Sequence, residues 1–180
     1  MHFEDISTIL ITGGYTMENL FHRISVRKYL DKPVRKEDIT EILRAGMQAP
    51  SAGNQQPWEF YVVTDKDVIA QLAKASPYAG CAAGAPAVIV PVYRTDGLRF
   101  PEFDQIDLAI AQENMWIMTD ALGLGGVWLA IAPVQDRMDA VRKILDLPDT
   151  LVPFSLFPVG WPAEEKKQQD RFEESRIHWQ

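Results

Sequence analysis

The chain of 180 residues has few of the residues that build disulfides and metal sites. Its only cysteine, Cys81, can form no disulfide within the chain and has no second thiol for a structural zinc site. Its three histidines, His2, His22 and His178, are scattered and show no paired metal-ligand spacing. We therefore expect no metal site.

Basic charge is also scarce. The chain has 18 Lys and Arg against 25 Asp and Glu, which gives a formal net charge of -7 at pH 7. Nucleic acids bind to basic faces, so this charge argues against a nucleic-acid partner. A local basic pocket for a phosphorylated small molecule is still compatible with it.

Long apolar runs are absent from the sequence. No stretch approaches the roughly 20 apolar residues of a transmembrane helix. Acidic residues stand near the start of the chain, where a secretory signal has a basic region. We therefore expect no membrane association and a cytoplasmic location, with which a single cysteine is consistent.

Several catalytic motifs are missing as well. The sequence has no GxSxG nucleophile elbow and no GxxxxGK[ST] phosphate loop. The glycine cluster at 123–126 follows a predicted helix and precedes a predicted strand. A dinucleotide-binding fingerprint lies between a strand and the helix after it, so this cluster does not fit one.

The hydrophobic pattern predicts mixed helices and strands. Residues 1–16 form an apolar-rich lead, and residues 17–180 form a single domain, because no repeat or linker interrupts them. Helices are predicted over 18–24, 36–47, 68–73 (with Asp65 as N-cap), 104–122 and 134–145, the last closed by Pro148, and strands over 60–63, 87–93, 127–131 and 152–159. This mixture predicts an α+β or α/β sandwich around a central sheet.

The helix at 104–122 is apolar around almost its whole circumference. Such a helix must be buried on all sides. A second subunit could bury the side that the chain's own sheet does not cover, which favours a homodimer. A central core helix in a monomer is the alternative.

Two polar segments carry the first signs of a binding site. Arg23, Ser25 and Arg27 alternate, so an extended chain points them to one side, where two guanidinium groups and a hydroxyl suit a phosphate and a sugar. An ordinary solvated charged edge is the alternative. The loop at 49–57 follows with two prolines and several amides, and Trp58 after it is expected to anchor the core.

Together these segments resemble the nitroreductase family of FMN enzymes. The resemblance covers residues 17–180 in five ordered elements. They are Arg23-x-Ser25-Val26-Arg27-x-Tyr29; Ala49-Pro50-Ser51-Ala52-x-Asn54-x-Gln56-Pro57-Trp58; Gln112-x-Asn114-Met115; Gly123-Leu124-Gly125 before Trp128; and Gly160-Trp161-Pro162-Ala163-Glu164-Glu165-Lys166 with Arg171 beyond it.

The resemblance implies an α+β fold with a central, mostly antiparallel sheet flanked by helices, and an intertwined homodimer with FMN at the subunit interface. The residues it assigns to FMN fall into four groups: Arg23, Ser25 and Arg27 for the phosphate, ribityl chain and pyrimidine edge; Pro50, Ser51, Ala52 and Asn54 from the partner subunit; Gly125 and Gly126 against the ring; and Arg171 at the phosphate. No catalytic acid or base is assigned.

The implied activity is an FMN-dependent oxidoreductase that passes hydride from NADH or NADPH through the flavin to a small oxidised acceptor, such as a nitroaromatic or a quinone. One alternative is a protein that stores or senses FMN without turnover. Another keeps the fold but changes the chemistry, as in reductive dehalogenation or flavin fragmentation. A domain whose arginines are only surface charge is the remaining alternative.

Overall fold

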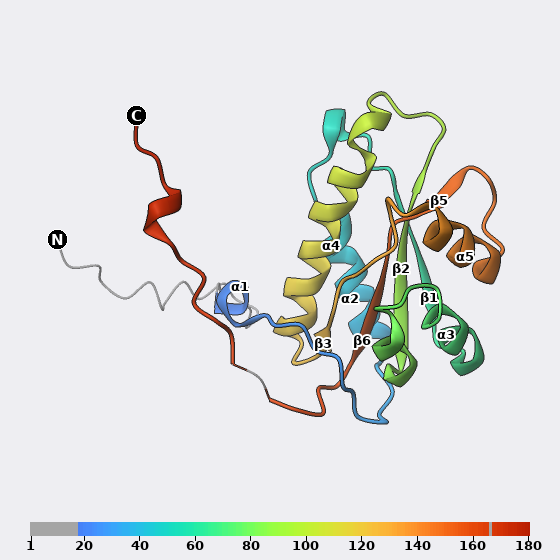
Figure 1. The fold of residues 1–180 in the computed structure, drawn as a ribbon, viewed down its shortest axis with the longest axis horizontal. Helices are drawn as coiled ribbons and strands as arrows, with labels where there is room; N and C mark the ends of the chain where they lie inside the picture. Colours follow the sequence, from blue (N-terminus) through green and yellow to red (C-terminus); the bar gives the residue numbers. More distant parts are fainter. Residues whose placement is uncertain (1–17, 166) are drawn as a thin grey trace.

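An antiparallel sheet forms the centre of the molecule (Figure 1). The computed structural model describes residues 18–165 and 167–180. The strands are β1 (Trp58–Val63), β2 (Ala87–Arg94), β3 (Gly125–Gly126), β4 (Leu129–Ala130), β5 (Leu151–Pro153) and β6 (Ser155–Gly160). Their order is β1-β2-β6-β3, while β4 pairs with β6 and β5 with β2, and every pair is antiparallel. The predicted mostly antiparallel sheet is confirmed.

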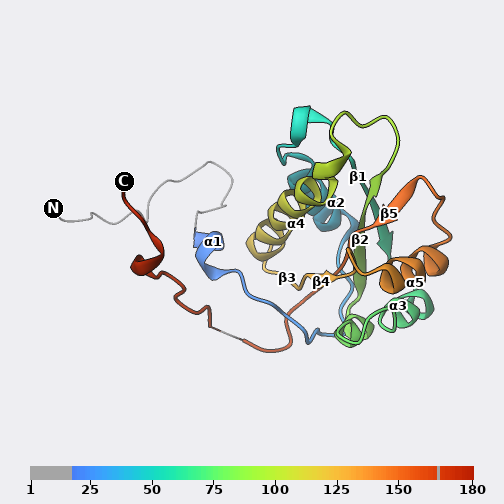
Figure 2. The ribbon, with the colours of Figure 1, turned by 45° about the horizontal axis from the view of Figure 1, so that its top comes forward.

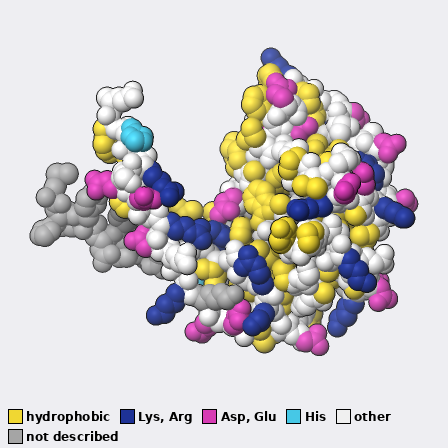
Figure 3. Space-filling model, in the orientation of Figure 1, with side chains coloured by type: hydrophobic (Ala, Val, Ile, Leu, Met, Phe, Trp, Pro, Cys, Tyr) yellow, Lys and Arg dark blue, Asp and Glu magenta, His cyan; other side chains and the backbone are white. Residues whose placement is uncertain are grey.

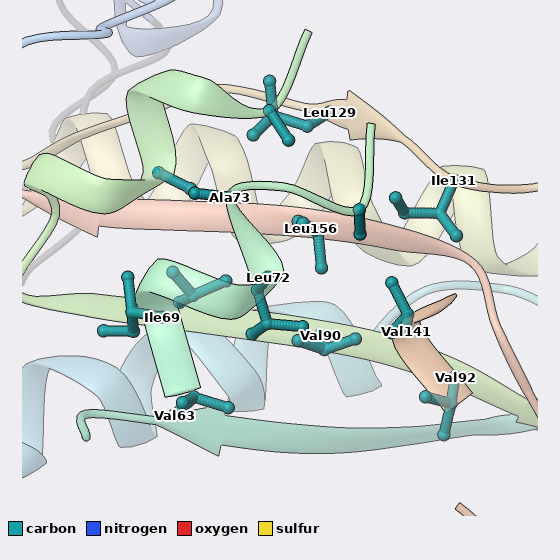
Figure 4. Close-up of a cluster of buried hydrophobic side chains, with 14 of the residues drawn as sticks. Val63, Ile69, Leu72, Ala73, Val90, Val92, Leu129, Ile131, Val141 and Leu156 are labelled. Atoms are coloured by element: carbon teal, nitrogen blue, oxygen red, sulfur yellow. The ribbon is translucent and has the colours of Figure 1, made fainter. Parts of the chain in front are cut away.

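Helices cover both faces of this sheet (Figure 2). α2 (Lys36–Met47) and α4 (Asp104–Ala121) lie on one face, and α3 (Lys66–Leu72) and α5 (Gln135–Leu145) lie on the other. Strand β2 serves both layers, because successive side chains of a strand point to opposite faces. Ile89 packs in the layer of α2 and α4, whereas Val88 and Val90 pack in the layer of α3 and α5. Figure 4 shows Val90 in the second layer, with Leu72 of α3 and Val141 of α5.

The C-terminal segment of the chain lies away from this body (Figures 1 and 3). α1 (Glu18–His22) lies beside the C-terminal segment, which contains the short 3-10 turn η4 (Glu174–Arg176). Phe172 and Trp179 of this segment are largely exposed in the single chain. The other 3-10 turns are η1 (Ala52–Asn54), η2 (Gly80–Gly84) and η3 (Pro101–Phe103). No helix of the described residues is long and apolar enough to span a bilayer.

Local sequence signals explain most of the helices. α2 covers the predicted range of 36–47. Asp65 caps α3 as predicted, since its carboxylate accepts hydrogen bonds from the backbone N–H groups of Asp67 and Val68. α5 ends at Leu145 as predicted, but Asp146 ends it and not Pro148, because Asp146 adopts a left-handed conformation with φ of 49°.

Two predicted strands are wrong in their bounds. Of the strand predicted at 127–131, only Leu129–Ala130 is a strand, β4, whereas β3 lies just before the predicted range, at Gly125–Gly126. The strand predicted at 152–159 is divided at Phe154. The register against β2 shifts by one residue there, since Val92 faces Pro153 but Ile89 faces Phe157. The N–H of Phe154 donates to Pro91 of β2, while its carbonyl accepts from Ile131 and Ala132.

The central helix α4 is not buried on all sides within the chain. Leu108, Ala111 and Met115 are fully buried against α2 and the sheet. On another side, Ile106 is 55% exposed and Ile110 is 37% exposed. That a second subunit covers this side, as in the expected homodimer, stays a prediction, and a monomer stays the alternative.

The lead predicted at 1–16 lies outside the described residues. The division into that lead and one domain over 17–180 stays a prediction.

Candidate functional site

The segment from Arg23 to Arg27 runs extended beside strand β3. The N–H of Val26 donates to the carbonyl of Gly126 at 3.0 Å, and Ser25 forms a parallel bridge with Gly126. Val26 is buried, whereas Arg27 is exposed, which agrees with the predicted two-sided segment. The sheet edge therefore fixes where the predicted phosphate-binding residues lie.

The two arginines of this segment have different surroundings. Arg23 is held within the chain: its Nε lies 3.0 Å from a carboxylate oxygen of Glu113, and its guanidinium lies 4.0 Å from the centre of the Trp116 ring. Arg27 is exposed and makes no ion pair with any residue of 18–165 or 167–180. Burial raises the pKa of the Cys81 thiol, and the nearby charge of Arg27 partly offsets that rise. Arg27 is thus a cation close to η2 that no acidic residue of the described ranges pairs with.

Arg171 reaches the same region from the C-terminal segment. It lines a hollow of about 600 Å³ together with Arg23, Leu20 and Phe21. The side-chain amide of Gln168 donates to the carbonyl of Arg23 at 2.6 Å and ties the two segments together. Like Arg27, Arg171 is exposed and unpaired within the described chain. A larger hollow, of about 660 Å³, is lined by Ile24 and Val26 and contains none of the predicted site residues.

The second predicted group, Pro50 to Asn54, lies on one tightly held loop. The N–H of Ala52 donates to Asp107 in the first turns of α4 at 2.9 Å. Gly53, Asn54 and Gln56 all have positive φ angles, of 55°, 54° and 47°. Non-glycine residues adopt such angles only where the surroundings impose them, and such strain is concentrated at functional sites.

Within one chain the arginine segment at 23–27 and the loop at 50–54 lie at opposite ends of α4 (Figure 1). Asp107 holds the loop at the N-terminal end, and Asp120 accepts a hydrogen bond from Asn19 of α1 near the C-terminal end. At 1.5 Å per residue these two carboxylates are separated by about 20 Å along the helix. The structure links Arg23 with Arg171 through a shared hollow, and Ser25 with Gly126 through a parallel bridge. It places Arg27 nearer to Cys81 and the loop elsewhere.

Comparison with known proteins bears on these two groups together. The profile of the nitroreductase family matches residues 20–79 and 77–161, which include the arginine segment, the loop and β3. The chain belongs to the nitroreductase family.

Individual relatives of this nitroreductase agree with that match. A protein of Archaeoglobus fulgidus with the provisional name NADH dehydrogenase/NAD(P)H nitroreductase is 37% identical, over 90% of this chain and 95% of its own. A crystal structure from Clostridium acetobutylicum, provisionally named an NADH oxidase, is 40% identical with a TM-score of 0.86, over 89% and 97% of the two chains. An FMN-dependent nitroreductase of Clostridium difficile is 26% identical with a TM-score of 0.85, over 91% and 98%. The predicted family and fold are confirmed.

Gly125 and Gly126 are required by packing within the nitroreductase chain itself. A Cβ atom on Gly125 would lie 2.5 Å from a methyl carbon of Val26. A Cβ atom on Gly126 would lie 2.7 Å from the ring of Phe157 and 3.0 Å from the carbonyl of Pro158. The approach of these glycines to a flavin ring stays a prediction, because their lack of side chains already has a cause in the core.

Two carboxylates at the start of α4 were not identified from the sequence. Asp107 holds the loop, and Asp104, one turn earlier, is buried with one oxygen that has no hydrogen-bond partner in the described chain. Burial, aided by the charges of Asp107 and Glu102, raises the pKa of Asp104 to about 6. Acidic residues are common in the first turn of a helix, so their types alone did not mark them.

Gly126→Ala tests the packing explanation. The added methyl group must displace Phe157 or the backbone at Pro158, so we expect unfolding free energy to fall by about 1–3 kcal/mol. Gly84→Ala is the matched control, because nothing lies within 4 Å of the Cβ position of Gly84. Denaturant unfolding of the flavin-free protein measures both, and equal stabilities of the two variants would contradict the explanation.

Asp104→Asn tests the raised pKa. An ionised Asp104 destabilises the folded protein above pH 6, and this penalty disappears below 3.8, where the group is protonated in both the folded and unfolded states. We expect the variant to exceed the wild type in unfolding free energy by on the order of 1–3 kcal/mol at pH 8, and to match it at pH 3.5. A difference between the two proteins that does not change with pH would refute this assignment.

Proposed function

We propose that this nitroreductase passes hydride from NADH or NADPH through FMN to a small oxidised acceptor, such as a nitroaromatic or a quinone, at sites shared by two subunits. The observation that carries the proposal is the separation of the two predicted site groups along α4. Neither group can complete the site within its own chain, whereas two copies can supply both. The enzyme class, an FMN-dependent NAD(P)H oxidoreductase, is the one that the names of its relatives give.

A homodimer is supported by the apolar side of α4 that the chain leaves uncovered. Apolar residues stand at positions 103, 106, 110, 117 and 121 along this side, at helical spacing. Asn114 interrupts them, and its amide donates to the carbonyl of Ala45. Phe103 and Ile106 are exposed near one end of it. Near the other end, Ile117 and Ala121 line a shallow groove of about 360 Å³ with Ala45 of α2. An apolar stripe at this spacing is the surface that a second helix covers.

A two-fold axis across the middle of α4 would bring the two site groups together. Such an axis makes the paired helices antiparallel, so the N-terminal end of one lies beside the C-terminal end of the other. The loop at Ala52 from one subunit then faces Ser25 and Gly126 of its partner. This arrangement forms two equivalent sites and covers Ile106 and Ile110 at the same time.

The side chains in the arginine region suit a phosphorylated flavin. Arg27 and Arg171 offer two guanidinium groups that no acidic residue in the described chain neutralises, and guanidinium groups bind phosphate oxygens in two-point contacts. Ser25 adds a hydroxyl between Arg23 and Arg27. Arg23, being paired with Glu113, supports this region more than it supplies a free charge.

FMN, when bound, supplies the hydride chemistry, and the protein supplies position and charge. Arg171 would hold the phosphate, and Arg27 would supply positive charge at the pyrimidine edge of the ring. The loop at Ser51 to Asn54 of the partner subunit would limit the space beside the ring. No side chain is assigned as a proton donor. A cytoplasmic location stays a prediction.

The visible spectrum of the purified protein, recorded without oxygen, tests the activity. We expect a flavin absorption band, intrinsic or after FMN is added, that either NADH or NADPH bleaches and a nitroaromatic or a quinone restores. A band that neither nucleotide bleaches would favour FMN storage or sensing. The absence of any band after FMN is added would refute the site.

Heterodimers test the shared site. Arg27→Ala removes a cation from one site group, and Asn54→Ala alters the other, so each homodimer should lose most activity. A heterodimer with one variant in each subunit keeps one site in which both groups are intact, so we expect about half the wild-type turnover per dimer. Differently tagged subunits allow that heterodimer to be purified. No recovery of turnover would mean that each site is built within one chain.

A further inference from the structure

The side chain of Gln55 joins the loop at Ala52 to a second loop, between β2 and α4. Its amide nitrogen donates to the carbonyl of Phe100 at 3.0 Å, and its amide oxygen accepts from the N–H of Phe100 at 3.0 Å. Turning the amide over would place its oxygen against the carbonyl oxygen of Phe100 and its NH2 group against the N–H of Phe100. The backbone of Phe100 therefore fixes which end of the amide faces α4.

Asp107 completes this arrangement from α4. Its side chain is 2% exposed, and its two oxygens take two different donors. One oxygen accepts from the N–H of Ala52 at 2.9 Å, and the other accepts from the amide nitrogen of Gln55 at 2.8 Å. Only a carboxylate offers an acceptor to both, because an amide at this position has a single oxygen.

The two loops are also in direct contact. A Cβ atom on Gly53 would lie 2.6 Å from the ring of Phe100, so that ring packs on the backbone of the loop. The same loop is also held by Arg94, whose guanidinium donates to the carbonyls of Gln55 and Gln56. These contacts hold the positive φ angles of Gly53 and Gln56 in place.

We propose that Asp107 is a positioning residue that sets, through Gln55, the backbone of both loops as one unit. One loop carries Ser51, Ala52 and Asn54, and the other carries Phe100. This inference rests on the proposed function, because Asp107 would act on the FMN site of the partner subunit through the loop it holds. On this proposal, the loop between β2 and α4 also helps to support the FMN site of the partner subunit.

Amide hydrogen exchange in the flavin-free protein is the first test. Asp107→Asn leaves one acceptor for two donors, so we expect the N–H of Ala52 to exchange at least about tenfold faster. The decisive probe is the N–H of Phe100, which does not contact Asp107. We expect its exchange to quicken similarly, because it depends on Gln55. Unchanged protection of Phe100 would overturn the proposal, whatever the protein binds.

A double-variant cycle gives the second test, in the protein that carries FMN. With Gln55 present, we expect Asp107→Asn to weaken FMN binding and to raise KM for a quinone acceptor, each by about tenfold or more. In a Gln55→Met background the single amide oxygen of the new Asn can turn to Ala52. We then expect Asp107→Asn to add less than about threefold. Equal effects in both backgrounds would overturn the coupling through Gln55.

Asp65→Ala is the matched control for lost stability. Asp65 is also a carboxylate that accepts two backbone N–H groups, but it caps α3, away from both loops. The variant should lose stability and keep the wild-type affinity for FMN and the wild-type KM. If it weakened FMN binding as much as Asp107→Asn, general destabilisation would replace positioning as the cause. A wild type that binds no FMN would instead refute the proposed function, while the exchange test would still decide the role of Asp107.

Discussion

Most of this structure depends on how the 18-residue helix α4 is covered. Its apolar side chains extend around nearly the whole circumference, and the sheet with α2 can cover only part of it. Gly46 of α2 lets the two helices approach closely, since a Cβ atom there would lie 2.7 Å from the side chain of Met115. The remaining apolar side needs another surface, and a copy of the same helix offers one of matching spacing. In the proposed dimer, the same packing that covers this side also brings together the two site groups at the ends of α4.

Much of the fold could be predicted from local sequence signals. Helix α2 has the predicted bounds because its apolar spacing is regular from end to end, and Asp65 marked the start of α3 by its own hydrogen-bonding capacity. The short strands could not be predicted in the same way. β3 consists of two glycines, which show no alternation of side chains, and only their pairing with Val159 and Gly160 makes them a strand. That pairing joins residues distant in sequence, so no local window contains it.

The candidate site also combines features that a local stretch of sequence shows with contacts between residues distant in sequence. The alternation of Arg23, Ser25 and Arg27 and their resemblance to the nitroreductase family were visible in the sequence, and the structure sets them beside β3. The pairing of Arg23 with Glu113 and the role of Asp107 were not visible. Asp107 meets its partners 52 and 55 residues away along the chain. Its place in a predicted helix gave no sign of these contacts.

The opposite placing of the two site groups has a thermodynamic consequence. In the proposed dimer, a dissociated subunit keeps the cations for the phosphate but lacks the loop that faces the ring. FMN then binds the dimer more tightly than the separate subunits, so linkage requires the cofactor to strengthen the association of the subunits by the same factor. At low protein concentration, loss of flavin would then promote dissociation of the proposed dimer, and dissociation would promote loss of flavin.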